Sequence, residues 1–226
     1  MFKRYAKMAK AFTKIGRDIS IAVKLGGPNP ESNSRLRMVL QNAKAVNMPK
    51  ANIEAAIKRA TEKNAANYEE VIYEAYAPHG VPLLIETTTD NPTRTVANIR
   101  MHLNRGGGTL GTSGSVSFMF ERKGTFKIDA ANMNKEEMEL NLIDWGAEDI
   151  EWDDESNEVI VTTAFVDFGK MQQSLEEHKI PVKESNKVFV PLNMVELPED
   201  QQKDVLALID KLEEDDDVVA VYHNMA

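Results

Sequence analysis

The spacing of hydrophobic residues changes near residue 71, and this change constrains the fold more than any other feature of the sequence. Before it, apolar residues recur at three- and four-residue steps, as on one face of a helix. The first such set is Phe12, Ile15, Ile19 and Val23. After it, runs such as VIYEAYA and VPLLIETTT are rich in β-branched and aromatic residues, which predicts strands. We therefore expect an all-helical start and a mixed α/β remainder.

Residues 1–64 predict a domain of three short helices. Glycines and a proline at 26–28 end the first helix. Ser32 or Asn33 can cap the second helix with its side chain. Pro49 suits the first turn of the third helix.

The remainder predicts two α/β domains. Residues 122–190 follow the order strand, helix, strand, strand, helix, strand, which is the ferredoxin-like arrangement. Residues 65–121 and 191–226 supply β-β-α-β and β-α-β, which together make a second compact unit with two helices on one sheet. The expected fold class is α+β: an N-terminal three-helix domain plus two ferredoxin-like α/β domains, one inserted into the other. Two consecutive domains are the alternative topology.

Two further segments are expected to be strands of the discontinuous domain. SVSFMF at residues 115–120 would complete the β-β-α-β part, and VPLNMVEL at residues 190–197 would begin the β-α-β part.

The charge of the chain is distributed unevenly. The formal net charge is −9, yet residues 1–63 hold 14 Lys and Arg against 4 Asp and Glu. That start carries +10 and the remaining residues −19. Such asymmetry points to a polyanionic partner on one side of the protein. The alternative is a basic domain that docks on its own acidic neighbours.

Basic residues follow one stripe of the first helix and continue on the next two. Each phosphate that such a surface neutralises releases counterions, so nucleic acid is the expected partner, with DNA or ribosomal RNA and the ribosome as candidates. Few aromatic side chains accompany the stripe, which favours contacts to backbone and shape over base stacking. The candidate nucleic-acid-binding residues are Lys3, Arg4, Lys7, Lys10, Lys14, Arg17, Lys24, Arg35, Arg37, Lys44, Lys50, Lys58 and Arg59.

The stretch RGGGTLGTSGS at residues 105–115 holds five glycines. A phosphate-binding loop or a nucleophile elbow needs a strand before it and a helix after it, and here the order is reversed. A helix C-cap at Gly106 or Gly107 explains one glycine but not five. We expect an exposed, flexible contact loop, in which replacing Gly107 and Gly108 by alanine costs function more than stability. Its candidate contact residues are Arg105, Gly106, Gly107, Gly108, Thr109, Gly111 and Ser113.

No catalytic or metal-binding pattern emerges from the sequence. Cysteine is absent, and the four histidines share no ligand spacing. We expect a protein that is not an enzyme, with no cofactor, no metal and no small-molecule substrate. No long apolar run predicts a membrane span, and the lack of cysteine suits the cytoplasm. The basic, acid-poor start also fits a mitochondrial presequence, although the first helix of a domain is the favoured interpretation.

Several motifs follow one another in a distinctive order: KMAKAFTKIGRDISIAVKLGGPNPESNSRLRMVLQNAKAVNMPKANIEAAIKRA, NYEEVIYEAYAPHGV, TDNPTRTVANIR, GGTLGTSGSVSFMFERKG and DDVVAVYHN. In this order they resemble the YebC/PmpR family, also called the translational activator of cytochrome c oxidase I family. The resemblance covers essentially the whole chain. It implies a helical N-terminal domain plus two α/β domains, one inserted in the other.

The resemblance also implies a non-enzymatic function in gene expression. Members are described as cytoplasmic regulators that bind DNA and control transcription, and others act in translation with the ribosome. Members usually carry a further basic segment ahead of the position that matches Lys3 and Arg4, where this chain starts. If part of the nucleic-acid surface lies in that segment, we expect lower affinity here.

Overall fold

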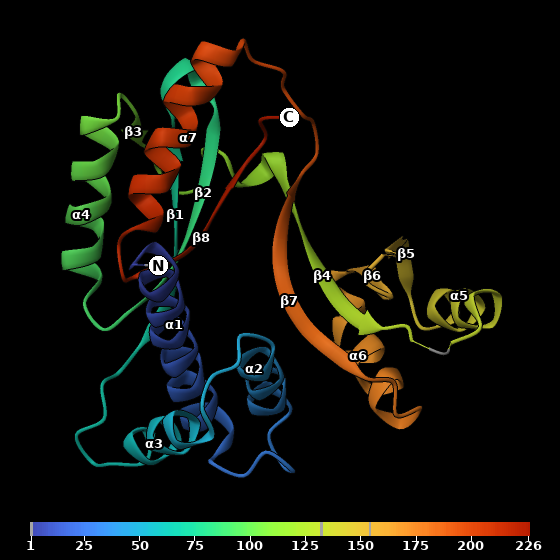
Figure 1. Ribbon diagram of the computed structural model, residues 1–226. Coiled ribbons are helices and arrows are strands. Elements are labelled where there is room, and N and C mark those ends of the chain that lie inside the picture. Colours follow the sequence, from blue (N-terminus) through green and yellow to red (C-terminus); the bar gives the residue numbers. More distant parts are fainter. Residues whose placement is uncertain (1, 132, 154) are drawn as a thin grey trace. The chain divides into compact units, whose positions relative to one another are not determined.

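A computed structural model describes the backbone of residues 2–131, 133–153 and 155–226, and within these ranges the side chains from Met8 onward. The described residues form seven α-helices and two four-stranded antiparallel sheets (Figure 1), which confirms the predicted α+β class. The chain packs as two compact units. The first comprises Met1–Leu36, Pro49–Glu121 and Phe189–Ala226, and the second comprises Arg37–Met48 and Arg122–Val188.

The sheet of the first unit has the strand order β3-β1-β2-β8. Its long central hairpin joins β1 (Glu69–Tyr76) to β2 (Pro82–Thr89) in antiparallel register. Strand β8 (Val218–His223) pairs with β2, and the short β3 (Thr109–Leu110) pairs with β1. Helices α4 (Pro92–Arg105) and α7 (Glu199–Glu213) cover one face of this sheet (Figure 1).

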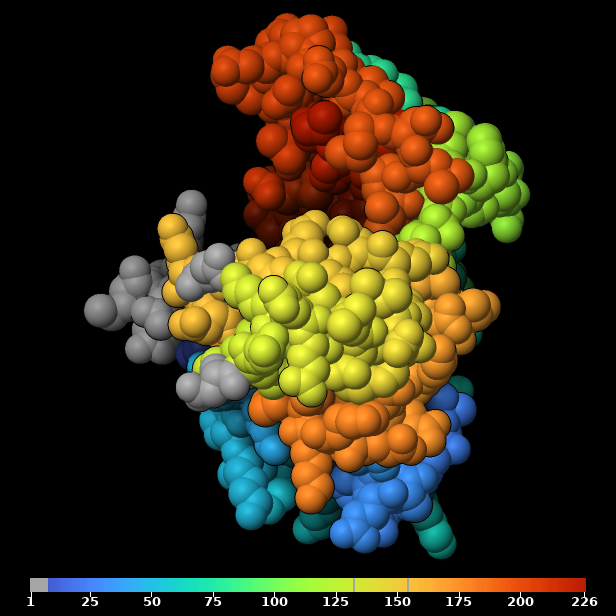
Figure 2. Space-filling model, turned by 90° about the vertical axis from the view of Figure 1, so that its right-hand side faces the viewer, coloured from blue at the N-terminus to red at the C-terminus, as the bar shows by residue number. Residues whose placement is uncertain are grey.

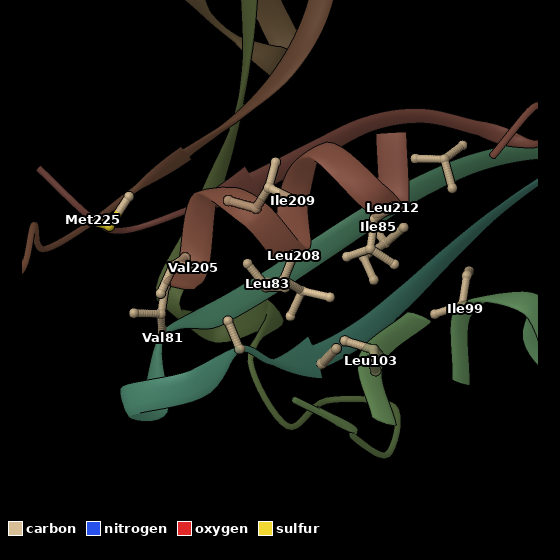
Figure 3. Close-up of a cluster of buried hydrophobic side chains, with 13 residues drawn as sticks. Val81, Leu83, Ile85, Ile99, Leu103, Val205, Leu208, Ile209, Leu212 and Met225 are labelled. Carbon is tan, nitrogen blue, oxygen red and sulfur yellow. The ribbon is translucent and has the colours of Figure 1, made fainter. Parts of the chain in front are cut away.

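Alternation along the strands explains why the two helices sit on that face. Leu83 and Ile85 of β2 are fully buried and point toward the helices, as Figure 3 shows. Apolar side chains at three- and four-residue spacing on the helices pack against them. They are Ile99 and Leu103 of α4, and Val205, Leu208, Ile209 and Leu212 of α7. Burial of these aliphatic side chains at about 25 cal/mol per Å² stabilises the two-layer arrangement.

Two segments predicted as strands are strands only at one end. Residues 117–119 form a 3₁₀ helix (Ser117–Met119), and the ladder resumes at Phe120. In 190–197, β7 ends at Pro191 and Val195 forms only an isolated bridge to Met225. The reason is that their backbone groups form other hydrogen bonds than those of a strand ladder. The Ser117 amide donates to the Glu74 carboxylate, and the Leu192 amide donates to the Met119 carbonyl. The vacant edge of β1 is taken instead by β3, inside the glycine-rich stretch.

Two helices from the start of the chain complete the first unit. Helix α1 (Phe2–Gly26) packs against α3 (Lys50–Ala60). The chain leaves α1 through Asn33, whose side-chain nitrogen donates to the carbonyls of Ala22 and Gly27, each at 2.8 Å. The Asn33 side-chain oxygen accepts from the Leu36 amide at 3.0 Å, so Asn33 caps α2 (Ser34–Ala45) as predicted.

The second unit has the ferredoxin-like order. Its elements are β4 (Phe120–Asp129), α5 (Lys135–Asp144), β5 (Ala147–Asp153), β6 (Glu158–Ala164), α6 (Phe168–Glu177) and β7 (Val182–Pro191). The strand order is β5-β6-β4-β7, and α5 and α6 cover one face of the sheet. Figure 2 shows the outer surfaces of α5 (yellow) and α6 (orange), which adjoin over this core. Phe126 and Phe168 stack within it at 4.7 Å between ring centroids.

Most of α2 belongs to this second unit. The Asn42 side chain forms two hydrogen bonds with β7, on the edge that no other described strand pairs with. Its nitrogen donates to the Ser185 carbonyl at 2.9 Å, and its oxygen accepts from the Ser185 backbone amide at 3.0 Å. Met38 packs against the core under α5 and α6. An edge strand is thereby covered. The three-domain division of the chain, with residues 1–64 as one domain, stays a prediction.

Asp217 connects four segments of the first unit. Its carboxylate, 4% exposed, accepts from Arg17 of α1 at 2.9 Å and from Arg94 of α4 at 2.9 Å. The hydroxyls of Thr95 and Thr89 also donate to it, at 2.7 and 3.2 Å. Burial alone would raise the pKa of Asp217, but these donors and the two guanidinium charges lower it below its usual value.

We expect Asp217→Asn to lower the free energy of unfolding by about 3 kcal/mol, because it leaves two guanidinium groups without their buried partner. The matched control is Asp210→Asn, an exposed carboxylate of α7, for which a change within about 0.5 kcal/mol is expected. Urea unfolding measures both. An Asp217 variant as stable as the Asp210 variant would contradict this.

The stabilisation by Asp217 has a defined pH dependence. Its folded pKa is lowered, so its contribution is present above the unfolded pKa of about 3.9 and is lost as the pH falls through the folded pKa. The stability gap between the parent and Asp217→Asn should stay level from about pH 5 to 8 and close in stronger acid. Unfolding curves across this range measure it.

Candidate nucleic-acid interface

The basic side chains of α1 turn toward the protein, as far as they are described. Lys3, Arg4 and Lys7 lie outside the residues whose side chains the structure describes. The Nζ atom of Lys10 is buried and has no hydrogen-bond partner among the described residues. Burial lowers the pKa of Lys10, against the opposing pull of the acidic residues at 213–216.

Lys14 and Arg17 form intramolecular hydrogen bonds. The Lys14 Nζ donates to the Val219 carbonyl at 2.7 Å, and burial lowers its pKa. Arg17 donates to the carbonyls of Thr88 and Asp216 at 2.9 and 2.7 Å, besides its ion pair with Asp217. Both residues thus bind other parts of the same unit, as the docking alternative describes: Arg17 binds Asp216 and Asp217 of the acidic run, and Lys14 binds Val219 just after it. Their contact with nucleic acid stays a prediction.

Three further candidates are held by pairs within their own unit. Lys24 donates to the Ala66 carbonyl at 2.6 Å, which fixes the segment between α3 and β1. Arg35 pairs with Glu70. In the second unit Arg37 forms two hydrogen bonds with Glu176, at 3.2 and 3.1 Å.

The outer face of α3 carries cations that point into solvent. Lys50, Lys58 and Arg59 are exposed, and Lys63 on the following turn is exposed as well. The pair of Lys50 with Glu54, at 3.7 Å between well-exposed groups, constrains Lys50 little. Ala56 and Ala60 on the opposite side are buried. Helix α3 is therefore anchored by small apolar residues and presents its charges outward.

Lys44, the remaining candidate, lies in the second unit near the end of α2 and is exposed. Its ammonium group has no hydrogen bond or ion pair with any other residue that the structure describes.

The glycine-rich stretch is tightly built at its start. Gly106 is the C-cap of α4, and Gly107 has a φ of +73°, as expected for a helix that ends on glycine. Gly108 is buried: a Cβ there would lie 2.6 Å from the Tyr76 carbonyl of β1. The Gly111 amide donates to the Glu74 carbonyl at 2.8 Å. Close approach to β1 accounts for Gly108 and Gly111, and the end of α4 accounts for Gly106 and Gly107. These glycines thus have structural roles, and the flexibility of the loop stays a prediction.

The tip of the stretch is held by one carboxylate. Glu74 of β1 accepts from the amides of Gly114, Val116 and Ser117 at 2.6, 2.7 and 2.9 Å. Burial would raise the pKa of Glu74, but these backbone donors lower it. Sequence reasoning missed Glu74 because it lies 40 residues from Gly114. Arg105, Thr109 and Ser113 are exposed, and their contact with a partner stays a prediction.

Asp18 is an acid in the middle of the basic stripe of α1, and this placement is the sequence signal that marks it. It is half-buried, and burial together with the negative charges of Glu70 and Glu86 raises its pKa to about 7. The positive charges of Arg35 and Lys14 oppose this shift only in part.

The described residues offer no group of three His, Asp or Glu side chains arranged to hold a metal ion. Within the same residues, no helix combines the length and the apolar character that crossing a bilayer requires.

Comparison with known proteins identifies the relatives of this chain. Residues 1–63 match the N-terminal domain model of the TACO1/YebC protein, and residues 68–225 match the model of the second and third domains. The chain belongs to the TACO1/YebC family. The expected resemblance to YebC/PmpR proteins is thereby confirmed.

Relatives within the TACO1/YebC family align over nearly their whole length. A "probable transcriptional regulatory protein" of Myxococcus xanthus is 52% identical over all of this chain and 95% of its own. One of Flavobacterium psychrophilum with that description is 54% identical over 99% of this chain and 94% of its own. The crystal structure of a conserved hypothetical protein from Aquifex aeolicus matches with a TM-score of 0.82 and 39% identity, covering 96% of this chain and 90% of that chain.

We expect Gly108→Ala to lower the free energy of unfolding by about 1–3 kcal/mol, because a backbone carbonyl occupies the place of the new methyl group. Gly107→Ala should also destabilise, through its positive φ. Gly16→Ala in α1 is the control, since its Cβ meets open space and alanine favours the helix by about 1 kcal/mol. Urea unfolding compares the three. Equal stability of the Gly108 variant and the parent would contradict a structural role for this glycine and would favour a role in function alone.

We expect Asp18→Asn to raise stability at pH 8 by roughly 2 kcal/mol and to change it little near pH 4. The folded pKa of about 7 lies above the unfolded value, so the parent is most stable when Asp18 is protonated and loses that stability as the pH rises to 7. Glu62→Gln, at an exposed carboxylate, is the control. Parallel stability–pH curves for the parent and Asp18→Asn would contradict the raised pKa.

Proposed function

We propose that this protein is a non-enzymatic, cytoplasmic regulator of gene expression that binds the backbone of a nucleic acid through the outer face of α3. The observation that carries the proposal is the orientation of Lys50, Lys58 and Arg59, which are exposed on one short helix. Cations placed in this way neutralise phosphates at a small cost, because their intramolecular partners are weak: Lys50 lies 3.7 Å from the exposed Glu54 carboxylate, and Arg59 donates to the Ala55 carbonyl at 3.3 Å.

Transcriptional control through DNA is the first form of this proposal. It is supported by the description of the Myxococcus and Flavobacterium relatives as probable transcriptional regulatory proteins. In this form the α3 cations hold the DNA backbone and fix the position of the protein along it.

Binding of ribosomal RNA, with a function in translation, is the second form. One observation favours it: the exposed positions between the cations of α3 include Ala51 and Ala55. Their methyl groups offer no hydrogen bonds to base edges, so the face suits recognition of shape and backbone.

Binding in a salt series tests the interface. We expect the Lys50→Gln, Lys58→Gln, Arg59→Gln triple variant to bind duplex DNA and structured RNA more weakly, with a plot of log affinity against log salt that is flatter by about 2–3. The matched control removes three exposed lysines elsewhere, Lys170, Lys203 and Lys211. An unchanged slope for the α3 variant, or an equal loss in the control, would refute the proposal.

The two forms differ in what the protein accompanies in a lysate. Sedimentation through sucrose at increasing salt, beside promoter-DNA binding by purified protein, separates them. Salt-sensitive co-migration with ribosomal particles and no sequence preference on DNA supports the translational form. Sequence-selective promoter binding without such co-migration supports the transcriptional form.

A further inference from the structure

The second unit contains a pocket of about 560 Å³, within the range of about 300–1,000 Å³ typical of sites for small molecules. Its walls come from the end of α2, from β4 and β6, and from the start of β7. The lining residues are Gln41, Lys44, Ala45, Lys127, Glu158, Ile180, Pro181, Val182, Lys183 and Glu184.

The pairing of Asn42 with Ser185 positions one wall of the pocket. It fixes α2 beside the edge of β7 through two hydrogen bonds of 2.9 and 3.0 Å. Three residues of α2, from Gln41 to Ala45, therefore reach the pocket as one wall, and Lys44 stands in that wall.

The charges of the pocket are unbalanced toward the positive. Glu158 is shared by two ammonium groups, Lys127 at 2.5 Å and Lys183 at 3.0 Å. The Glu184 carboxylate accepts a hydrogen bond from the side-chain nitrogen of Asn186 at 2.7 Å. Lys44 has no acceptor within the described part of the chain. Among the lining residues, three lysines thus face two carboxylates, one of which already has a neutral donor. A third carboxylate, Asp129, lies outside the lining at 3.8 Å from Lys183.

The rest of the lining is apolar. Ala45, Ile180, Pro181 and Val182 supply a hydrocarbon wall beside the three ammonium groups. A ligand that fits both parts has a compact anionic group and a larger, mostly uncharged body. A phosphate accepts from several ammonium groups at once, and a nucleoside offers the uncharged body.

We propose that this pocket binds a nucleotide, with its phosphate held by Lys44, Lys127 and Lys183 and its nucleoside against the wall of Ile180 and Val182. Glu158 keeps Lys127 and Lys183 in place when the site is empty and competes with the phosphate for them. The nucleotide is either free or one unit of a nucleic-acid strand. The site and the α3 interface lie in different units, so separate variants test them.

Titrations of the full-length protein with AMP and with inorganic pyrophosphate test the site, followed by amide NMR shifts and calorimetry. We expect Lys44→Gln to weaken both by about three- to fivefold, and Glu158→Gln to tighten both because two lysines are released. Lys170→Gln is the matched control: Lys170 is an exposed lysine of α6 that donates to the Asp144 carbonyl and lines no part of the pocket. Thermal unfolding checks that Glu158→Gln remains folded.

Equal affinities of the parent and Lys44→Gln, or a Glu158→Gln variant that binds no tighter than the parent, would overturn the proposal. An eight-nucleotide RNA then identifies the source of the phosphate. Displacement of AMP by the RNA supports a strand of nucleic acid, and failure to displace it supports a free nucleotide. The α3 triple variant should bind AMP as the parent does, so failure of the α3 interface is distinguishable from failure of this site.

Discussion

The first unit depends on one buried carboxylate. Asp217 lies just before β8 and binds Arg17 of α1 together with Arg94 and Thr95 of α4. Two guanidinium groups could not approach each other here without a negative charge between them, and a lone buried charge would be expensive. Because α3 packs on α1, the position of the exposed α3 cations follows from this contact as well.

Cations of the basic start therefore fall into two groups. Lys14 and Arg17 bind carbonyls and carboxylates of the acidic remainder, and Lys24 fixes the segment after α3. The cations of α3 have no comparable partner and point outward. A net charge of +10 over residues 1–63 does not distinguish these groups, because composition carries no information on which side chains are covered.

Local patterns predicted the parts of the fold that local patterns determine. The α+β class, the ferredoxin-like order of the second unit and the cap at Asn33 all rest on periodicity or on a residue and its near neighbours. The segments 115–120 and 190–197 had the composition of strands, yet distant groups bind their amides. Likewise, the sequence marked the glycine-rich stretch as unusual but could not reveal Glu74 or the Tyr76 carbonyl, which decide its shape.

The central claim is that α1 cations hold the protein together whereas α3 cations bind its partner. Two single variants test it most directly, Arg17→Gln and Lys58→Gln, each measured for its unfolding free energy and for the salt slope of nucleic-acid binding. The predicted result is crossed: Arg17→Gln loses stability and keeps the slope, and Lys58→Gln keeps stability and flattens the slope. A stable Arg17→Gln protein with a flattened slope would contradict the claim.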